Sequence, residues 1–185
     1  MNLEDFSLKM VRIKHRCRDY KPDPATEILI IGTFNPDTDH NSADFFYGRP
    51  KNHLWTLLPA AYNEPYLKKA HKDDKIAFIK KHKIGFADLI SEISVPENTE
   101  TDYRDSFIDD KVSAWNDVIS QISSLKKLKK VCFTRKTFSE IPNIRKKIEE
   151  IRSYCEEKGI YFQYLITPAR IYSADKQNEW SICFN

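Results

Sequence analysis

The sequence predicts an α/β protein: a single three-layer α/β/α domain with a small, mainly parallel central sheet. Short apolar segments alternate with amphipathic segments along the chain, which is typical of a parallel sheet covered by helices on both faces. The clearest strand covers residues 27–33, an apolar run bounded by Pro24 on one side and by Gly32 and Pro36 on the other. Because the run lacks polar alternation, we expect this strand at the centre of the sheet.

The remaining elements follow from the same periodicities. Leu54, Trp55, Leu57 and Leu58 recur at helical spacing and predict a helix over residues 52–61. Acidic residues suit the positive end of a second helix over 73–82. Residues 96–110 show no hydrophobic period, so we expect a polar excursion outside the core. The other predicted elements are an apolar segment at 84–93, helices at 113–128, 142–158 and 174–184, and strands at 130–134 and 160–166.

Length and composition limit the class of protein. The 185 residues, 41% hydrophobic and 31% charged, suit one globular domain spanning 1–185, with 1–26 as a basic N-terminal extension packed on it. No apolar run reaches the roughly 18 residues that a membrane span needs, and the charged N-terminus lacks the pattern of a secretory signal. We therefore expect a cytoplasmic monomer with no membrane partner.

Metal and cofactor sites are not indicated. The four cysteines are scattered without a Cys-x-x-Cys pair, so we expect reduced thiols and no metal. With four glycines in the whole chain, the glycine-rich phosphate cradles of dinucleotide and nucleoside-triphosphate sites are close to excluded, and no cofactor is expected. The net charge of +3 does not by itself require a nucleic-acid partner.

Two loops are expected to face each other beyond the carboxyl ends of the strands, where ligands of open sheets bind. They cover residues 33–51, after the first strand, and 167–174, after the last. The first carries aromatic rings that can stack on a base, worth about 1–3 kcal/mol per base, amides or a ring that can bind a base edge or a water, and cations that can bind phosphate. These candidates are Thr33, Phe34, Asn35, Phe46, Tyr47, Arg49, Lys51, Asn52 and His53.

Each candidate also has an ordinary structural role. A Phe-Phe-Tyr run is more often core than a ligand platform. Asn52 suits a helix N-cap, Trp55 suits the buried face of the same helix, and Arg49 and Lys51 are solvated by default.

The segments GTFNP (32–36) and FYGRPKNHLW (46–55) resemble the uracil-DNA glycosylase superfamily, most closely its mismatch-specific uracil/thymine and hypoxanthine-DNA glycosylase branches. The resemblance is specific over about thirty residues. It implies a uracil-DNA glycosylase-like fold, in which Asn35 positions the attacking water and Tyr47 stacks on the base. In the hypoxanthine branch the catalytic amide falls at Asn52. The two branches thus nominate different asparagines, and both assignments stay open.

The family's second motif, a His-Pro-Ser or Leu-Pro-Ser type loop, is replaced here by LITPARIYSAD (165–175). In this departing loop, Thr167, Pro168, Arg170 and Ser173 could still bind phosphate. Ile171 or Tyr172 would then fill the space left by an extruded nucleotide. The loop contains no histidine.

The function that the resemblance implies is that of a monofunctional DNA glycosylase in base excision repair. Such an enzyme flips uracil, hypoxanthine or mismatched thymine out of duplex DNA and hydrolyses the N-glycosidic bond. The alternative is a catalytically weak or inactive nucleic-acid- or nucleotide-binding module on the same fold. A third hypothesis is an unrelated small-molecule enzyme, such as a nucleoside hydrolase, which the low net charge favours.

Overall fold

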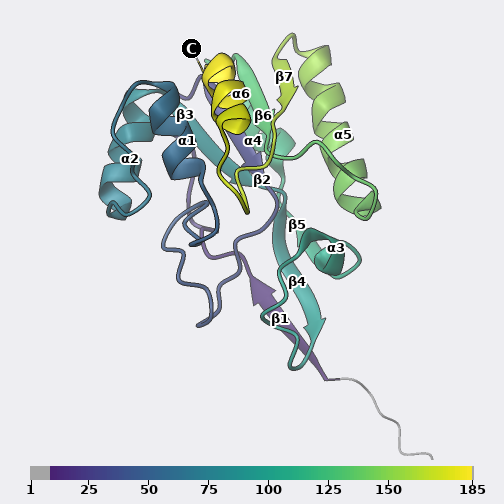
Figure 1. Ribbon diagram of the computed structural model, residues 1–185. Coiled ribbons are helices and arrows are strands. Elements are labelled where there is room, and N and C mark those ends of the chain that lie inside the picture. The colour runs from purple at the N-terminus through teal and green to yellow at the C-terminus, as the bar shows by residue number, and fades with distance from the viewer. Residues whose placement is uncertain (1–8, 185) are drawn as a thin grey trace, which may run out of the picture.

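The computed structural model describes residues 9–184 and confirms the predicted three-layer α/β/α arrangement (Figure 1). Its centre is a four-stranded parallel sheet in the order β3-β2-β6-β7. The predicted central strand lies inside this sheet, paired on both sides. The strands are β2 (Ile28–Gly32), β3 (Ile84–Asp88), β6 (Lys130–Phe133) and β7 (Tyr161–Tyr164).

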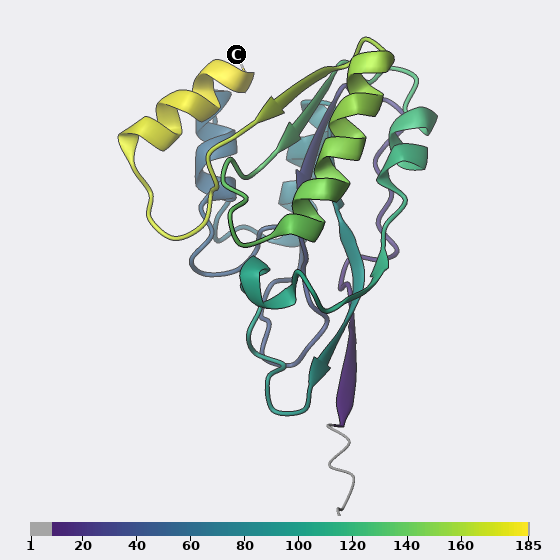
Figure 2. The same cartoon turned by 90° about the vertical axis from the view of Figure 1, so that its right-hand side faces the viewer.

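Alternating side chains of the central strand serve two separate cores. Leu29 and Ile31 pack in a cluster with α4 (Val118–Ser124) and α5 (Pro142–Glu157) on one face. Ile30 points to the other face and packs in a second cluster. Figure 2 shows the resulting two helical layers on either side of the sheet. The second layer consists of α1 (Leu54–Ala61), α2 (Lys72–Lys81) and α6 (Ala174–Phe184).

A second, antiparallel sheet extends beyond the carboxyl ends of the parallel strands (Figure 1). It has the order β1-β4-β5, with β1 (Met10–Lys14), β4 (Ile90–Pro96) and β5 (Val112–Trp115). A single residue, Leu89, separates β3 from β4, so one apolar segment passes directly from one sheet into the other. Within the expected extension 1–26, residues 10–14 thus pair with β4, whereas residues 1–8 lie outside the described part.

The predicted helix over 113–128 is wrong in its first half. Residues Val112–Trp115 form β5, and the helix starts only at Val118. The polar residues between them end the strand and start the helix. Asn116 donates its side-chain amide to the carbonyl of Asp88 at 2.8 Å, and Asp117 accepts a bond from the Ser120 backbone N–H at 3.0 Å, as an N-cap does.

The predicted polar excursion over 96–110 also needs correction, because it contributes to the core. It contains the short helix α3 (Asp105–Ile108), and Ile108 is fully buried. The buried Asp109 carboxylate accepts backbone N–H bonds from Ile144 at 2.7 Å and from Asn143 at 3.0 Å. It therefore caps the start of α5, where helical N–H groups lack partners within the helix.

The other predicted elements are confirmed with small shifts of their ends. The helix predicted at 142–158 is Pro142–Glu157, and the one predicted at 174–184 is Ala174–Phe184. The apolar segment 84–93 supplies β3 and the start of β4. All four cysteines are free thiols, and no helix of the described chain is both long and apolar enough to cross a membrane.

Replacing Asp109 with alanine is expected to destabilise the protein by about 2 kcal/mol, because the first turn of α5 loses its charged acceptor. Urea unfolding monitored by circular dichroism measures the change. Asp117→Ala removes the exposed cap of α4 and should cost less. Equal losses for the two variants would show that the segment 96–110 does not anchor α5.

Candidate functional site

A cavity of about 800 Å³ opens at the carboxyl ends of β2, β3 and β6. Parallel register brings these ends together, with Gly32 opposite Asp88 and Ile31 opposite Phe133. Both predicted loops reach the cavity, and the α3 segment supplies another wall. The lining comes from residues 32–35, 101–106, 133–137 and 166–170, together with Tyr47, Arg49, Lys51, Asn52, Asp88 and Glu140.

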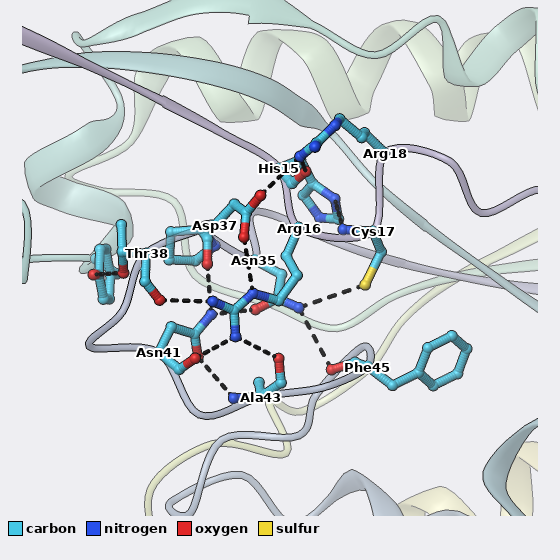
Figure 3. A network of polar contacts seen from close by, with 12 residues as sticks. His15, Arg16, Cys17, Arg18, Asn35, Asp37, Thr38, Asn41, Ala43 and Phe45 are labelled. Carbon is cyan, nitrogen blue, oxygen red and sulfur yellow. Dashed lines mark hydrogen bonds and ion pairs between the residues drawn. The ribbon is translucent and has the colours of Figure 1, made fainter. Parts of the chain in front are cut away.

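Arg16 holds the loop after β2 in place (Figure 3). Its guanidinium donates to the carbonyls of Thr38 at 2.6 Å and Ala43 at 3.0 Å, and also to the carbonyl of Asn41. It also pairs with the Asp37 carboxylate at 3.3 Å. A single planar cation with several donors thus satisfies three carbonyls of the same loop, which holds the loop in place without a regular element.

The Asn35 amide lies inside this braced loop and is committed to it (Figure 3). Its Oδ1 accepts a bond from Nδ2 of Asn41 at 2.8 Å, and its own Nδ2 donates to the Phe45 carbonyl at 3.5 Å and towards the Cys17 sulfur at 3.7 Å. Only 4% of the residue is exposed. Asn35 lines the cavity, but its amide has little capacity left for a water or a ligand.

Tyr47 sits at the cavity floor in a left-handed backbone conformation with φ of 55°. Its ring lies 5.6 Å from that of Phe86, and its hydroxyl bonds to Oγ1 of Thr134 at 3.1 Å. Desolvation by burial is the main cause that raises the Tyr47 pKa well above its ordinary value. The phenol is therefore neutral, and Tyr47 contributes an aromatic side chain to the lining of the cavity.

Asn52 and His53 join the two predicted loops directly. Asn52 forms an isolated β-bridge with Ala169, and the His53 backbone N–H bonds to the Pro168 carbonyl at 2.8 Å. The Asn52 Oδ1 accepts the Leu54 backbone N–H at 2.9 Å just before α1, close to the N-cap role. Within the described chain, its Nδ2 forms no hydrogen bond, so this side of the amide is available to the cavity that it lines.

Contrary to expectation, His53 and Phe46 do not line the cavity. His53 Nδ1 lies 3.2 Å from Lys68 Nζ, and Nε2 lies 3.1 Å from the Arg170 carbonyl. The ring therefore contacts the backbone of the second loop outside the cavity. Phe46 is 3% exposed and stacks on Phe86 with 5.5 Å between ring centroids. It belongs to the core, as a Phe-Phe-Tyr run usually does.

Arg49 enters the cavity wall instead of remaining solvated. Its Nη2 donates to the Phe34 carbonyl at 3.0 Å, and the guanidinium lies 5.0 Å from the Tyr103 ring centroid. Burial lowers its pKa, an effect that the nearby Asp88 charge opposes. Phe34 is mostly buried beside it, and Lys51 is exposed at the rim.

Asp105 ties the loop ends together around the cavity. It accepts a bond from the Thr33 hydroxyl at 2.8 Å and forms an ion pair with Arg135. Thr33 thus follows β2, Arg135 follows β6, and α3 supplies the carboxylate between them. The polar segment 96–110 gave no hint of this role, because its partners are distant in the sequence.

A buried pair, His15 and Asp88, completes the floor and was missed by the sequence analysis. His15 Nε2 lies 2.7 Å from Asp88 Oδ2, and both side chains are less than a tenth exposed. Asp88 lines the cavity, while His15 stands behind it. The sequence contained one sign of this pair, namely a carboxylate at the end of the apolar run 84–88.

The second loop is largely exposed, and only its first residues line the cavity. Ile171 is 75% and Tyr172 41% exposed, and neither lines it. Arg170 is exposed at the rim and has a left-handed backbone conformation with φ of 72°. Thr167 lines the cavity, whereas the Ser173 hydroxyl accepts the Lys176 backbone N–H at 3.3 Å and starts α6.

The site therefore offers a neutral aromatic ring, an available amide, a buried carboxylate and a half-buried guanidinium, with an exposed loop beside them. Among residues 9–184 no group of three or more His, Cys, Asp or Glu side chains is placed to hold a metal ion. Such a cavity suits a flat polar ring with hydrogen-bonding edges.

The raised Tyr47 pKa predicts an effect of pH on stability. Unfolded chains lose the tyrosine proton near about pH 10, whereas the folded protein retains it. The contribution of Tyr47 to the free energy of unfolding is therefore complete below about pH 10. It declines as pH rises towards the pKa of Tyr47 in the folded protein, by up to about 1.4 kcal/mol per pH unit. Between pH 10 and 11, Tyr47→Phe should lose less unfolding free energy than the wild type, as measured by urea titration. Tyr66→Phe, at an exposed position, should match the wild type.

Comparison with known proteins supports the fold. No protein-family model matches the chain, and no curated protein matches it. Among solved structures, the chain is similar to the solution NMR structure of a "putative uracil DNA glycosylase" from Methanosarcina acetivorans. The TM-score is 0.61 at 24% identity, over 88% of this chain and 91% of that one. The chain therefore has the fold of that protein, an α/β/α fold of the uracil-DNA glycosylase type.

Proposed function

We propose that the protein is a monofunctional DNA glycosylase that removes a deaminated or mismatched base from duplex DNA. The observation that carries this proposal is the shared cavity of Tyr47 and Asn52, next to the exposed segment Arg170–Tyr172. A flipped base would stack on Tyr47 while the segment fills the vacated space in the duplex. The fold shared with the Methanosarcina protein is consistent with this arrangement.

The proposed reaction needs no cofactor. The bond between the sugar C1′ and the base nitrogen breaks, and the base leaves with the electron pair and takes up a proton. A water oxygen bonds to C1′ and its proton is released to solvent, so the products are an abasic site and a free base. Donors that face the departing base and an oriented water stabilise this charge separation.

Of the two candidate amides, the contacts favour Asn52 for positioning the water. The Asn35 amide bonds to Asn41 and to the Phe45 carbonyl, within a loop that Arg16 holds rigid. The Asn52 Nδ2 has no such commitment among the described residues. Asn35 then shapes the loop, and Asn52 acts on the substrate.

The test of the function is a single-turnover assay on duplexes that contain uracil, hypoxanthine or thymine opposite guanine. We expect release of free base, with the DNA strand intact until alkali is added. Release from nucleosides but not from DNA would replace the proposal with a nucleoside hydrolase. We further propose that the chain acts as a single domain and a monomer in the cytoplasm.

A DNA-binding module without catalysis is the second candidate. The observation that favours it is the segment 167–173, which departs from the His-Pro-Ser or Leu-Pro-Ser motif and contains no histidine. Tight binding to lesion-containing duplexes, with no base released over long incubation, would establish this candidate.

Asn52→Ala is expected to lower the single-turnover rate by roughly 10²–10³-fold while leaving DNA binding intact, which is the size of effect seen when one positioned polar group is removed. Asn35→Ala should instead lower stability by about 1–3 kcal/mol, because a buried hydrogen-bond network loses its centre. Asn178→Ala, at an exposed position of α6, serves as the control. The assignment is wrong if Asn35→Ala gives the larger loss of rate in folded protein.

Arg170→Ala is expected to weaken DNA binding and to make it less salt-dependent. A lost phosphate contact should reduce the slope of log K against log salt by about 0.9. Lys126→Ala is the matched control, because this exposed cation lies before the amino end of β6, whereas the cavity lies at the carboxyl ends of the strands. Fluorescence anisotropy between low and moderate salt measures both slopes, and equal slopes for Arg170→Ala and wild type would rule the contact out.

A further inference from the structure

Asp88 is a buried carboxylate that the hydrolysis described above leaves without a role. It ends β3 on the floor of the cavity and is 7% exposed. A charged group is rarely buried unless hydrogen bonds compensate it. The partners of its two oxygens therefore decide what it can do.

One oxygen is committed to His15. The His15 Nδ1 accepts the Cys17 backbone N–H at 3.0 Å, so the ring proton of the neutral imidazole lies on Nε2. Nε2 then donates to Asp88 Oδ2 at 2.7 Å. The backbone of Cys17 thus fixes the tautomer, and through it the orientation of the carboxylate.

The other oxygen, Oδ1, faces the cavity floor. A methyl group added to Gly32 would lie 2.4 Å from Oδ1 and 2.7 Å from the Tyr47 hydroxyl, so all three crowd one spot. Glycine is required there because any Cβ would displace them. Within the described chain, Oδ1 accepts no hydrogen bond, which leaves one buried acceptor available to a ligand.

A donor accompanies this acceptor. Arg49 lines the same cavity, uses Nη2 for the Phe34 carbonyl, and has further N–H groups. The cavity wall thus combines one acceptor, from Asp88, with donors, from Arg49. This is the complement of a ring edge that carries a carbonyl next to an N–H.

We propose that Asp88 is the residue that selects the base, by accepting the ring N–H of a lactam while Arg49 donates to the adjacent carbonyl; this inference rests on the proposed function. Deamination creates this edge, since uracil and hypoxanthine carry C(=O)–NH where cytosine and adenine carry an amino group beside a ring nitrogen. One available oxygen matches the single proton of a ring N–H. A buried amino group would leave its second proton without a partner, which a polar site penalises strongly.

The hydrogen on His15 Nε2 makes the asparagine variant informative. In Asp88→Asn the amide oxygen must turn to His15, which needs an acceptor, so the amide NH₂ faces the cavity. The variant therefore presents a donor where the wild type presents an acceptor. It should lose its preference for a ring N–H without any change in size.

The experiment measures binding of free hypoxanthine and of 1-deazahypoxanthine, in which a C–H replaces the ring N–H, by calorimetry. Wild type should bind hypoxanthine roughly 10- to 100-fold more tightly, the value of one hydrogen bond to a charged group. Asp88→Asn should bind the two bases equally. Asp110→Asn, which removes an exposed carboxylate paired with Lys111, should behave as wild type.

An Asp88→Asn variant that keeps the wild-type ratio overturns the inference. A wild-type protein that binds the two bases equally, or binds neither, overturns it as well, so the result does not depend on whether the variant folds. Base release from lesion-containing duplexes is measured separately. If the protein discriminates between the two free bases but releases no base from DNA, the proposed glycosylase is contradicted and Asp88 remains the selecting residue. If it releases base from DNA but Asp88→Asn keeps the wild-type affinity ratio, the glycosylase stands and the role of Asp88 is contradicted.

Discussion

The site depends on one close approach at the end of the parallel sheet. The register of β2 and β3 sets Gly32 opposite Asp88, and the missing side chain of Gly32 makes room for both the carboxylate and the Tyr47 hydroxyl. Any Cβ there would meet these atoms well inside contact distance. Strand pairing and the smallest residue together therefore position the floor, before any loop contributes.

The segment that precedes the parallel sheet supplies its supports. His15 and Arg16 follow β1 directly, and the backbone amide of Arg16 bonds to the Asn35 carbonyl at 2.7 Å. The two neighbouring side chains act in different places. His15 bonds to the Asp88 carboxylate, whereas Arg16 holds the loop after β2 (Figure 3). The pairing of β1 with β4 in the short antiparallel sheet therefore places these two groups beside the site.

The sequence predicted the parallel sheet and most helices because those elements carry their own periodicity, as residues 27–33 and 142–158 do. The prediction from the sequence failed where an element or a residue depends on a contact with a residue far away in the chain. The end of β5 and the start of α4 depend on Asn116 bonding to the carbonyl of Asp88, and the role of Asp105 depends on Thr33 and Arg135. Local motifs brought Tyr47 and Asn52 to the cavity as expected. Patterns could not show that the Asn35 amide is already occupied, since Asn41 and Phe45 are also parts of an irregular loop.

A buried carboxylate beside the leaving base has an electrostatic consequence for the proposed chemistry. As the glycosidic bond breaks, the base gains negative charge, and the Asp88 charge opposes this gain. Two donors offset the repulsion: His15 Nε2 bonds to the far oxygen of Asp88, and the Arg49 guanidinium lies in the same wall. Charges interact more strongly where protein replaces water around them, so we expect the balance between these charges to affect the rate. A carboxylate in this position favours discrimination between bases over speed, whereas a neutral amide would reverse that preference. A base removed in this cavity would therefore leave against the negative charge of Asp88.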